Sequence, residues 1–158
     1  GKAHLKHTEG GDFRQATYRA IRHGLMKSES VLLEPFYKYQ VTVPENCMGR
    51  VMSDFERMHG SCFLKNNISG FVTLEGRVPV ATSKNYANDL RIFSKGQGVI
   101  SFVIDGYDVC HNELEVIQNI GYDANQDSEN PAFSVFCSHG SGFAVPWEQV
   151  DNYKHIKL

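Results

Sequence analysis

Apolar residues alternate with polar ones, or recur every three to four residues, through the middle of the chain. The alternating and β-favouring runs predict strands over 32–43, 61–68, 71–80 and 99–109. Helical spacing predicts one helix over 48–58 and a second between Ser83, the expected N-cap, and Gly96, the expected stop. The order of strand, helix, strand, strand, helix, strand predicts an α+β domain with the ferredoxin-like, split βαβ fold. In this fold both helices cover one face of an antiparallel sheet.

Further elements are expected on both sides of this domain. A helix is predicted over 13–27, with Asp12 as its N-cap and the end of a strand over 2–8 before it. One face of this helix carries apolar and small residues, and the opposite face is expected to meet solvent with Arg14, Arg19, Arg22 and Lys27. A short helix is predicted over 113–120, followed by an apolar hairpin or irregular arm over 132–145.

These patterns divide the chain into an N-terminal piece (1–30), a central domain (31–111) and a C-terminal extension (112–158). With 41% hydrophobic and 22% charged residues, the composition excludes a disordered or fibrous chain. The apolar runs are too short to cross a membrane, and the first residue is glycine, so we expect a piece of a longer protein. Four scattered cysteines favour a reducing, cytoplasmic location.

Charge is unevenly distributed, although the formal net charge is only −2. Residues 1–31 carry six Lys/Arg and three Asp/Glu, whereas residues 113–158 carry two and seven. His4, His7 and His23 add imidazoles whose protonated form a polyanion would favour. The N-terminal end is therefore the part of the chain best suited to contact RNA.

The sequence offers little support for catalysis. The phosphate-binding pattern G-x-x-x-x-G-K-[ST] is absent, and the paired glycines at 96–98 and 140–142 are expected to form turns. His4 and His7 are too few for a closed zinc site, so no metal site is predicted. Cys137 and His139 leave a thiol enzyme open as an alternative, although neighbours along one strand rarely form a catalytic pair. From its residues alone, the chain is interpreted as a binding module.

Two separated motifs resemble the end of the fourth domain and the fifth domain of elongation factor G and its relatives. The first motif resembles the junction between those domains; it consists of Asp12-Phe13-Arg14, a helix, and then 31–36 (VLLEPF). The segment 86–98 (YANDLRIFSKGQG) resembles the helix and exit loop of the fifth domain. The Asp12-Phe13-Arg14 spacing, the position of Phe93 and the pair Gly106-Tyr107 resemble the tetracycline ribosomal-protection branch most closely. The resemblance covers residues 1 to about 111 and independently implies a ferredoxin-like domain.

This resemblance implies that the parent protein is a translational GTPase, with GTP and Mg²⁺ bound in an N-terminal domain absent from this chain. The chain itself is expected to hold no cofactor, metal or catalytic residue, and to bind the ribosome as a cytoplasmic monomer. The implied tip loop contacts 16S ribosomal RNA at the decoding centre and displaces the drug; it consists of His4, Leu5, Lys6, His7 and Thr8.

Other residues are candidates for contact with ribosomal RNA or with the large-subunit stalk base: Arg14, Arg22, Lys95 and Gln97. An elongation factor G paralogue that acts in translocation without conferring resistance is the alternative within this class of protein. The acidic extension is expected to avoid RNA, because carboxylates and phosphates repel each other.

Overall fold

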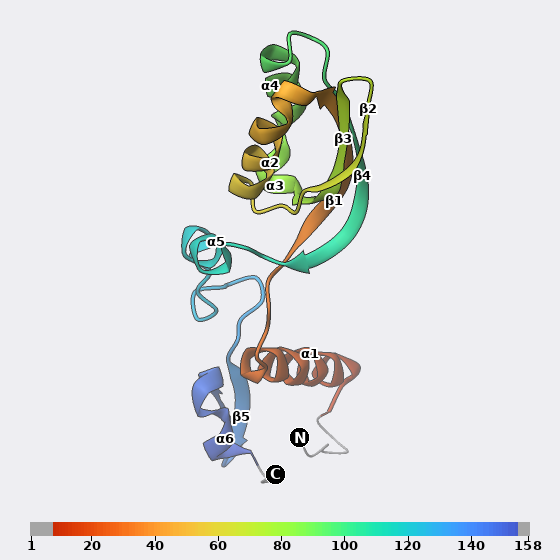
Figure 1. Cartoon of the computed structure of the whole chain (residues 1–158). Coiled ribbons are helices and arrows are strands. Elements are labelled where there is room, and N and C mark those ends of the chain that lie inside the picture. Colours follow the sequence, from red (N-terminus) through yellow and green to blue (C-terminus); the bar gives the residue numbers. More distant parts are fainter. Residues whose placement is uncertain (1–7, 155–158) are drawn as a thin grey trace. The chain divides into compact units, whose positions relative to one another are not determined.

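The computed structural model describes residues 8–154, which form two compact units (Figure 1). We call residues 31–113 the sheet domain. Of the other described residues, 8–30 together with 114–154 form the second unit, which we call the flanking unit. The C-terminal segment thus shares a unit with the N-terminal helix, and each unit is described by itself below.

The sheet domain contains four antiparallel strands in the order β2-β3-β1-β4, with helices over one face (Figure 1). Its elements, in chain order, are β1 (Leu33–Pro44), η1 (Glu45–Cys47), α2 (Met48–Arg57), β2 (Phe63–Ile68), β3 (Phe71–Pro79), α3 (Val80–Ser83), α4 (Tyr86–Phe93) and β4 (Val99–Val109). This architecture confirms the predicted ferredoxin-like fold. The strand predicted over 99–109 is β4, with the same bounds.

The core of the sheet domain lies between β1 and the helices. Alternate residues of β1 are buried, namely Tyr39, Val41 and Val43, because successive side chains of a strand point to opposite faces. The Tyr39 ring stacks on Phe55 of α2, with the ring centroids 3.7 Å apart. Tyr86 of α4 meets the same Phe55 edge to face, at 4.8 Å. Three aromatic rings therefore join the central strand to both main helices.

The segment before β2 passes very close to β3. The backbone N–H of Ser61 donates to the carbonyl of Arg77 at 2.8 Å, and the Arg77 N–H donates to Ser61 Oγ at 3.1 Å. The Tyr39 hydroxyl donates to the Ser61 carbonyl oxygen at 2.8 Å. A Cβ atom at Gly76 would lie 1.9 Å from that same oxygen. Only glycine fits at this crossing.

The tight turn between β2 and β3 was predicted correctly at Ser69-Gly70. Both residues have positive φ, 53° and 82°, as the two-residue turns of β-hairpins require.

Two predicted helix caps are wrong. Helix α1 (Gly10–Lys27) has Glu9 as its N-cap, and Asp12 is the third helical residue, whose carboxylate accepts the Glu9 N–H at 2.9 Å. Ser83 ends α3, where its hydroxyl donates to the Pro79 carbonyl at 2.9 Å, and Asn85 precedes α4. Asp12 therefore lies in the first turn of α1 and not before it, and Ser83 ends the preceding helix instead of capping α4.

The flanking unit contains α1 and a C-terminal segment with a β-hairpin. Helix α5 (Glu113–Ile120) leads into this segment and has the predicted bounds. Strands β5 (Ser134–Ser138) and β6 (Ser141–Val145) form the hairpin and are followed by η2 (Trp147–Gln149) and α6 (Val150–Tyr153). Between residues 8 and 154, no helix combines the length and the hydrophobicity needed to cross a membrane.

Two basic residues of α1, Arg22 and Lys27, contact the acidic C-terminal segment. An Arg22 guanidinium N–H donates to Asp127 Oδ2 at 2.9 Å and also to the Tyr122 hydroxyl, and Lys27 pairs with Asp151. Phe13 and Ile21, from the predicted apolar face, are each 58% exposed. Of the basic residues predicted to meet solvent, Arg14 and Lys27 are exposed, whereas the Arg22 side chain is only 24% exposed because the Asp127 carboxylate holds it. Periodicity alone could not reveal this partner, which lies 105 residues away.

We expect Gly76→Ala to lower the free energy of unfolding of the sheet domain by about 3 kcal/mol, because the new methyl group overlaps a backbone oxygen. Chemical unfolding followed by far-ultraviolet circular dichroism measures this. Gly49→Ala is the matched control, since no atom lies within 4 Å of its added Cβ and alanine favours the helix by about 1 kcal/mol. Equal stability of the two variants would contradict the close approach at Gly76.

We expect the flanking unit to lose stability in acid through Asp127. The Asn130 N–H, the Tyr122 hydroxyl and Arg22 all favour its carboxylate, which holds the pKa below the usual 3.8. A folded pKa below the unfolded value gives stability that is complete above pH 3.8 and is lost as pH falls toward the folded pKa. Asp127→Asn should lower stability at pH 7 and weaken the acid dependence.

The fluorescence of Trp147, the only tryptophan and part of this unit, reports the transition during urea unfolding at pH 7 and at pH 3. Glu129→Gln, which removes an exposed carboxylate of the same loop, is the control and should keep the wild-type acid dependence. Identical pH profiles for Asp127→Asn and the wild type would contradict the assignment.

Candidate functional site

The loop between α4 and β4 presents two predicted contact residues at the surface. Lys95 and Gln97 are both exposed. The backbone of Lys95 and Gly96 is left-handed, with φ of 54° and 80°, and the Gly96 N–H donates to the Arg91 carbonyl at 2.8 Å. This left-handed pair ends the helix and turns the chain toward β4.

A buried serine fixes the backbone of this loop. Ser94 is 3% exposed, and its Oγ accepts the N–H of Gly98 at 2.8 Å. Its carbonyl accepts the N–H of Gln97 at 3.1 Å. Lys95 and Gln97 therefore extend from a backbone that is already ordered, which reduces the entropy lost when a partner binds.

The same end of the sheet carries two further loops. Pairing of Thr42 with Val99 and of Pro44 with Phe71 places the start of β4, the end of β1 and the β2–β3 turn at one end. The Glu45 N–H donates to the Gly70 carbonyl at 2.9 Å, which ties two of these loops together. The loop with Lys95 and Gln97 thus lies beside two other loops at this end of the sheet.

The remaining predicted contact residues fall in the N-terminal part. His4, Leu5, Lys6 and His7 lie outside the described residues, and Thr8 is half-buried just before α1. Arg14 is exposed on α1. The Arg22 side chain is only 24% exposed and is held by Asp127, so a phosphate would have to compete with that carboxylate.

The alternative catalytic pair has no supporting geometry. Cys137 is exposed on β5, and His139 lies in the hairpin turn with φ of 52°. Among the hydrogen bonds and ion pairs found within residues 8–154, none joins this thiol to this imidazole. A nucleophilic cysteine needs an adjacent base, so the structure gives the thiol-enzyme hypothesis no support.

A groove of about 440 Å³ between the helices was not predicted from the sequence. Arg50 and Arg57 line it beside Asp54, whose side chain is 9% exposed and pairs with both guanidinium groups. The Tyr86 hydroxyl donates to Asp54 Oδ2 at 3.3 Å. Burial, with the nearby Asp54 carboxylate, raises the pKa of Tyr86. The charges of this groove are thus largely paired within it.

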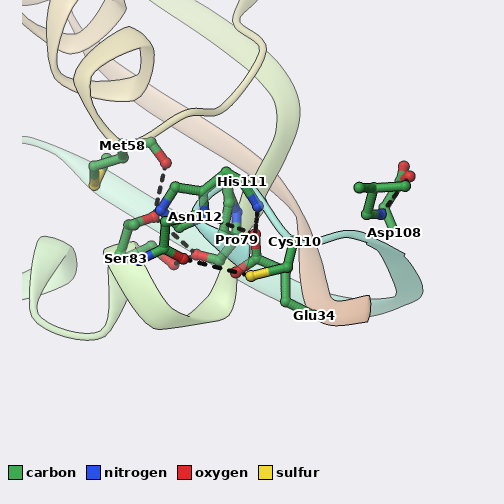
Figure 2. Close-up of polar contacts among 10 residues, drawn as sticks. Glu34, Met58, Pro79, Ser83, Asp108, Cys110, His111 and Asn112 are labelled. Carbon is green, nitrogen blue, oxygen red and sulfur yellow. Dashed lines mark hydrogen bonds and ion pairs between the residues drawn. The ribbon is translucent and has the colours of Figure 1, made fainter. Parts of the chain in front are cut away.

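The sequence also did not predict the cluster of Glu34, Cys110 and His111, which lies at the opposite end of the sheet (Figure 2). Glu34 Oε1 is 2.6 Å from His111 Nδ1 and accepts the His111 backbone N–H at 2.9 Å. Glu34 begins β1, and Cys110 and His111 follow β4. The antiparallel pairing of these two strands is the signal that could have brought the three residues together.

Comparisons with known proteins agree with this fold. A family model described as "Elongation factor G C-terminus" matches residues 31–117. An elongation factor G from Dehalococcoides mccartyi is 30% identical over 123 residues, which are 77% of this chain and 18% of that protein. A crystal structure of a Thermus thermophilus protein is similar, with a TM-score of 0.53 and 23% identity, over 59% of this chain and 14% of that one.

The chain thus spans a small part of the length of these two proteins, and the structural likeness supports the fold alone. The family match covers more than half of the residues and coincides with the sheet domain. The chain therefore belongs to the elongation factor G C-terminus family.

Proposed function

We propose that this chain is the ribosome-binding C-terminal part of a translational GTPase. The observation that carries the proposal is the family match over residues 31–117, which covers the whole sheet domain. GTP and Mg²⁺ would bind in a part of the parent protein outside this chain. The chain itself would act in the cytosol as a monomeric binding module, without a catalytic residue of its own.

The loop with Lys95 and Gln97 is the proposed contact with the large subunit, at the stalk base. An ammonium group attracts phosphate, and an amide can both donate to and accept from RNA. Ser94 holds the loop backbone through two hydrogen bonds, to Gly98 and Gln97, so these side chains are presented in a defined place. The ordered backbone supports a specific contact rather than a general attraction to RNA.

The N-terminal part is the proposed contact with 16S ribosomal RNA. Lys6, together with protonated His4 and His7, suits phosphate binding, and imidazole rings can stack on unpaired bases. Arg14 is exposed on the following helix and extends this positive charge. The acidic residues that would repel RNA instead engage Arg22 and Lys27 further along the helix.

The finer proposal is that the parent protein belongs to the tetracycline ribosomal-protection type, in which the loop of residues 4–8 displaces the drug. It rests on the sequence resemblance at Asp12-Phe13-Arg14, Phe93 and Gly106-Tyr107. The alternative is a paralogue that acts in translocation without conferring resistance. The similarity to an elongation factor G keeps that alternative open.

The double variant Lys95→Ala, Gln97→Ala in the full-length parent protein should bind ribosomes about tenfold more weakly, the loss expected for one charge-assisted contact of about 1.4 kcal/mol. Co-sedimentation with ribosomes in the presence of a non-hydrolysable GTP analogue measures the affinity. Lys38→Ala removes an exposed lysine from the strand β1 and is the charge-matched control. An equal loss in both variants would indicate non-specific attraction and count against this loop.

Expression of the full-length parent protein should raise the tetracycline concentration that inhibits bacterial growth, and the triple variant His4→Ala, Lys6→Ala, His7→Ala should abolish that protection. The variant removes the side chains proposed to contact 16S ribosomal RNA. Ribosome co-sedimentation of both proteins is the control for expression and folding. A well-expressed parent that binds ribosomes but gives no protection would exclude the protection type and favour the paralogue.

A further inference from the structure

Three different donor side chains meet where the chain enters and leaves the sheet domain. A carboxylate oxygen of Glu34, the thiol sulfur of Cys110 and an imidazole nitrogen of His111 all lie within 4.8 Å of one another. Glu34 and Cys110 are 7% and 8% exposed, and the His111 side chain is 18% exposed. Figure 2 shows these side chains at the ends of β1 and β4. A buried carboxylate, thiol and imidazole together are the donors typical of a transition-metal site.

We propose that Glu34, Cys110 and His111 bind a zinc ion. Thiolate, imidazole and carboxylate are the three ligand types that Zn²⁺ uses in proteins, whereas Mg²⁺ and Ca²⁺ prefer oxygen alone. This site is separate from the proposed ribosome-binding loop with Lys95 and Gln97, which lies at the other end of the sheet.

The spacing of the three donors suits this ion after a small adjustment. Zinc bonds of about 2.0–2.3 Å in tetrahedral geometry place neighbouring ligand atoms roughly 3.3–3.8 Å apart. The present separations extend from 2.6 Å, between Glu34 Oε1 and His111 Nδ1, up to 4.8 Å. Binding requires the carboxylate and imidazole to separate by less than about 1 Å while the thiol approaches.

Hydrogen bonds donated by backbone N–H groups hold the three residues together before any metal binds. The Cys110 N–H donates to the Leu32 carbonyl at 2.9 Å, and the Leu32 N–H donates to Glu113 Oε1 at 2.7 Å. The His111 N–H donates to Glu34 at 2.9 Å. The two strand ends are therefore fixed relative to each other, and a metal ion does not have to gather its ligands from a flexible loop.

The His111 side chain is 18% exposed, so this side of the cluster is the one from which a water molecule would take the fourth coordination position. The exposed His59 ring stacks on the His111 ring, with the centroids 4.4 Å apart and the planes at 28°. A parallel ring cannot direct its nitrogen at an ion bound by the ring below it. Three protein ligands and one water molecule therefore complete the coordination, and the His59 ring limits the rotation of His111.

On binding, the Cys110 thiol loses its proton to solvent and the thiolate forms a bond to zinc; no electron transfer takes place. The ion then links the first residues of β1 to the residue that follows β4. Since unfolding of the sheet domain separates these residues, zinc should raise the temperature of unfolding of this domain.

Titration of the EDTA-treated chain with ZnCl₂, followed by calorimetry, should show one zinc ion bound at this site. Co²⁺ in place of zinc should give the thiolate-to-cobalt charge-transfer absorption in the near ultraviolet. Cys110→Ser should abolish that absorption, and His111→Ala should weaken binding by more than about 100-fold, beyond the effect of losing an outer-shell partner. Glu34→Gln should weaken zinc binding in the same direction.

Three variants serve as controls. Cys137→Ser removes an exposed thiol that is not part of the cluster. The double variant His4→Ala, His7→Ala removes two histidines that lie three residues apart in the sequence. Both variants should bind zinc as the wild type does. His59→Ala should retain binding, because this ring is not a ligand. Circular dichroism verifies that each variant is folded, and a misfolded Cys110→Ser is replaced by Cys110→Ala.

The proposal is overturned if the wild-type chain binds no zinc, or if folded Cys110 and His111 variants bind it as tightly as the wild type. Loss of binding only in the His4, His7 variant would likewise overturn it and assign the metal to that pair. In each of these cases Glu34 and His111 form a hydrogen-bonded pair and nothing more.

Discussion

The stacking of Tyr39 on Phe55 is the contact on which the sheet domain depends. Tyr39 lies in β1, which pairs with β3 on one side and with β4 on the other. Its ring meets α2, and its hydroxyl donates to Ser61 just before β2. One side chain thus sets the distance between sheet and helices and also positions the chain that crosses over Gly76. Burial raises the pKa of Tyr39, so the phenol stays protonated and continues to donate.

The sheet domain could be predicted closely because its local signals agree with its packing. The residues 99–109, the Ser69-Gly70 turn and the apolar spacing of Met48, Val51 and Phe55 each predicted one element, and each element is present in the fold. The two wrong caps have a different origin. Asp12 completes a capping box with Glu9, which takes the cap position itself. The Ser83 hydroxyl instead donates back to the Pro79 carbonyl within the preceding helix, and Asn85 takes the cap position of α4.

The flanking unit could be predicted only in part, because its contacts join residues far apart in the sequence. The amphipathic pattern of α1 predicted the helix correctly but could not predict its ion pairs, since the carboxylates that contact Arg22 and Lys27 lie about 100 residues or more away. The candidate sites show the same limit. Lys95 and Gln97 could be chosen from one continuous segment, whereas Glu34 and His111 lie 77 residues apart and only strand pairing brings them together.

The pairing of β1 with β4 has a mechanical consequence. Both connections of the sheet domain to the rest of the chain leave from the same end of these two antiparallel strands, where Leu33 is opposite Val109. Tension applied through both connections would separate the two strands from this end, so the interstrand hydrogen bonds would break one after another and not all at once. The bonds from Cys110 to Leu32 and from Leu32 to Glu113 would bear the first of that force. The pairing of β1 with β4 is thus weak under tension, although the close-packed core of the same domain resists compression.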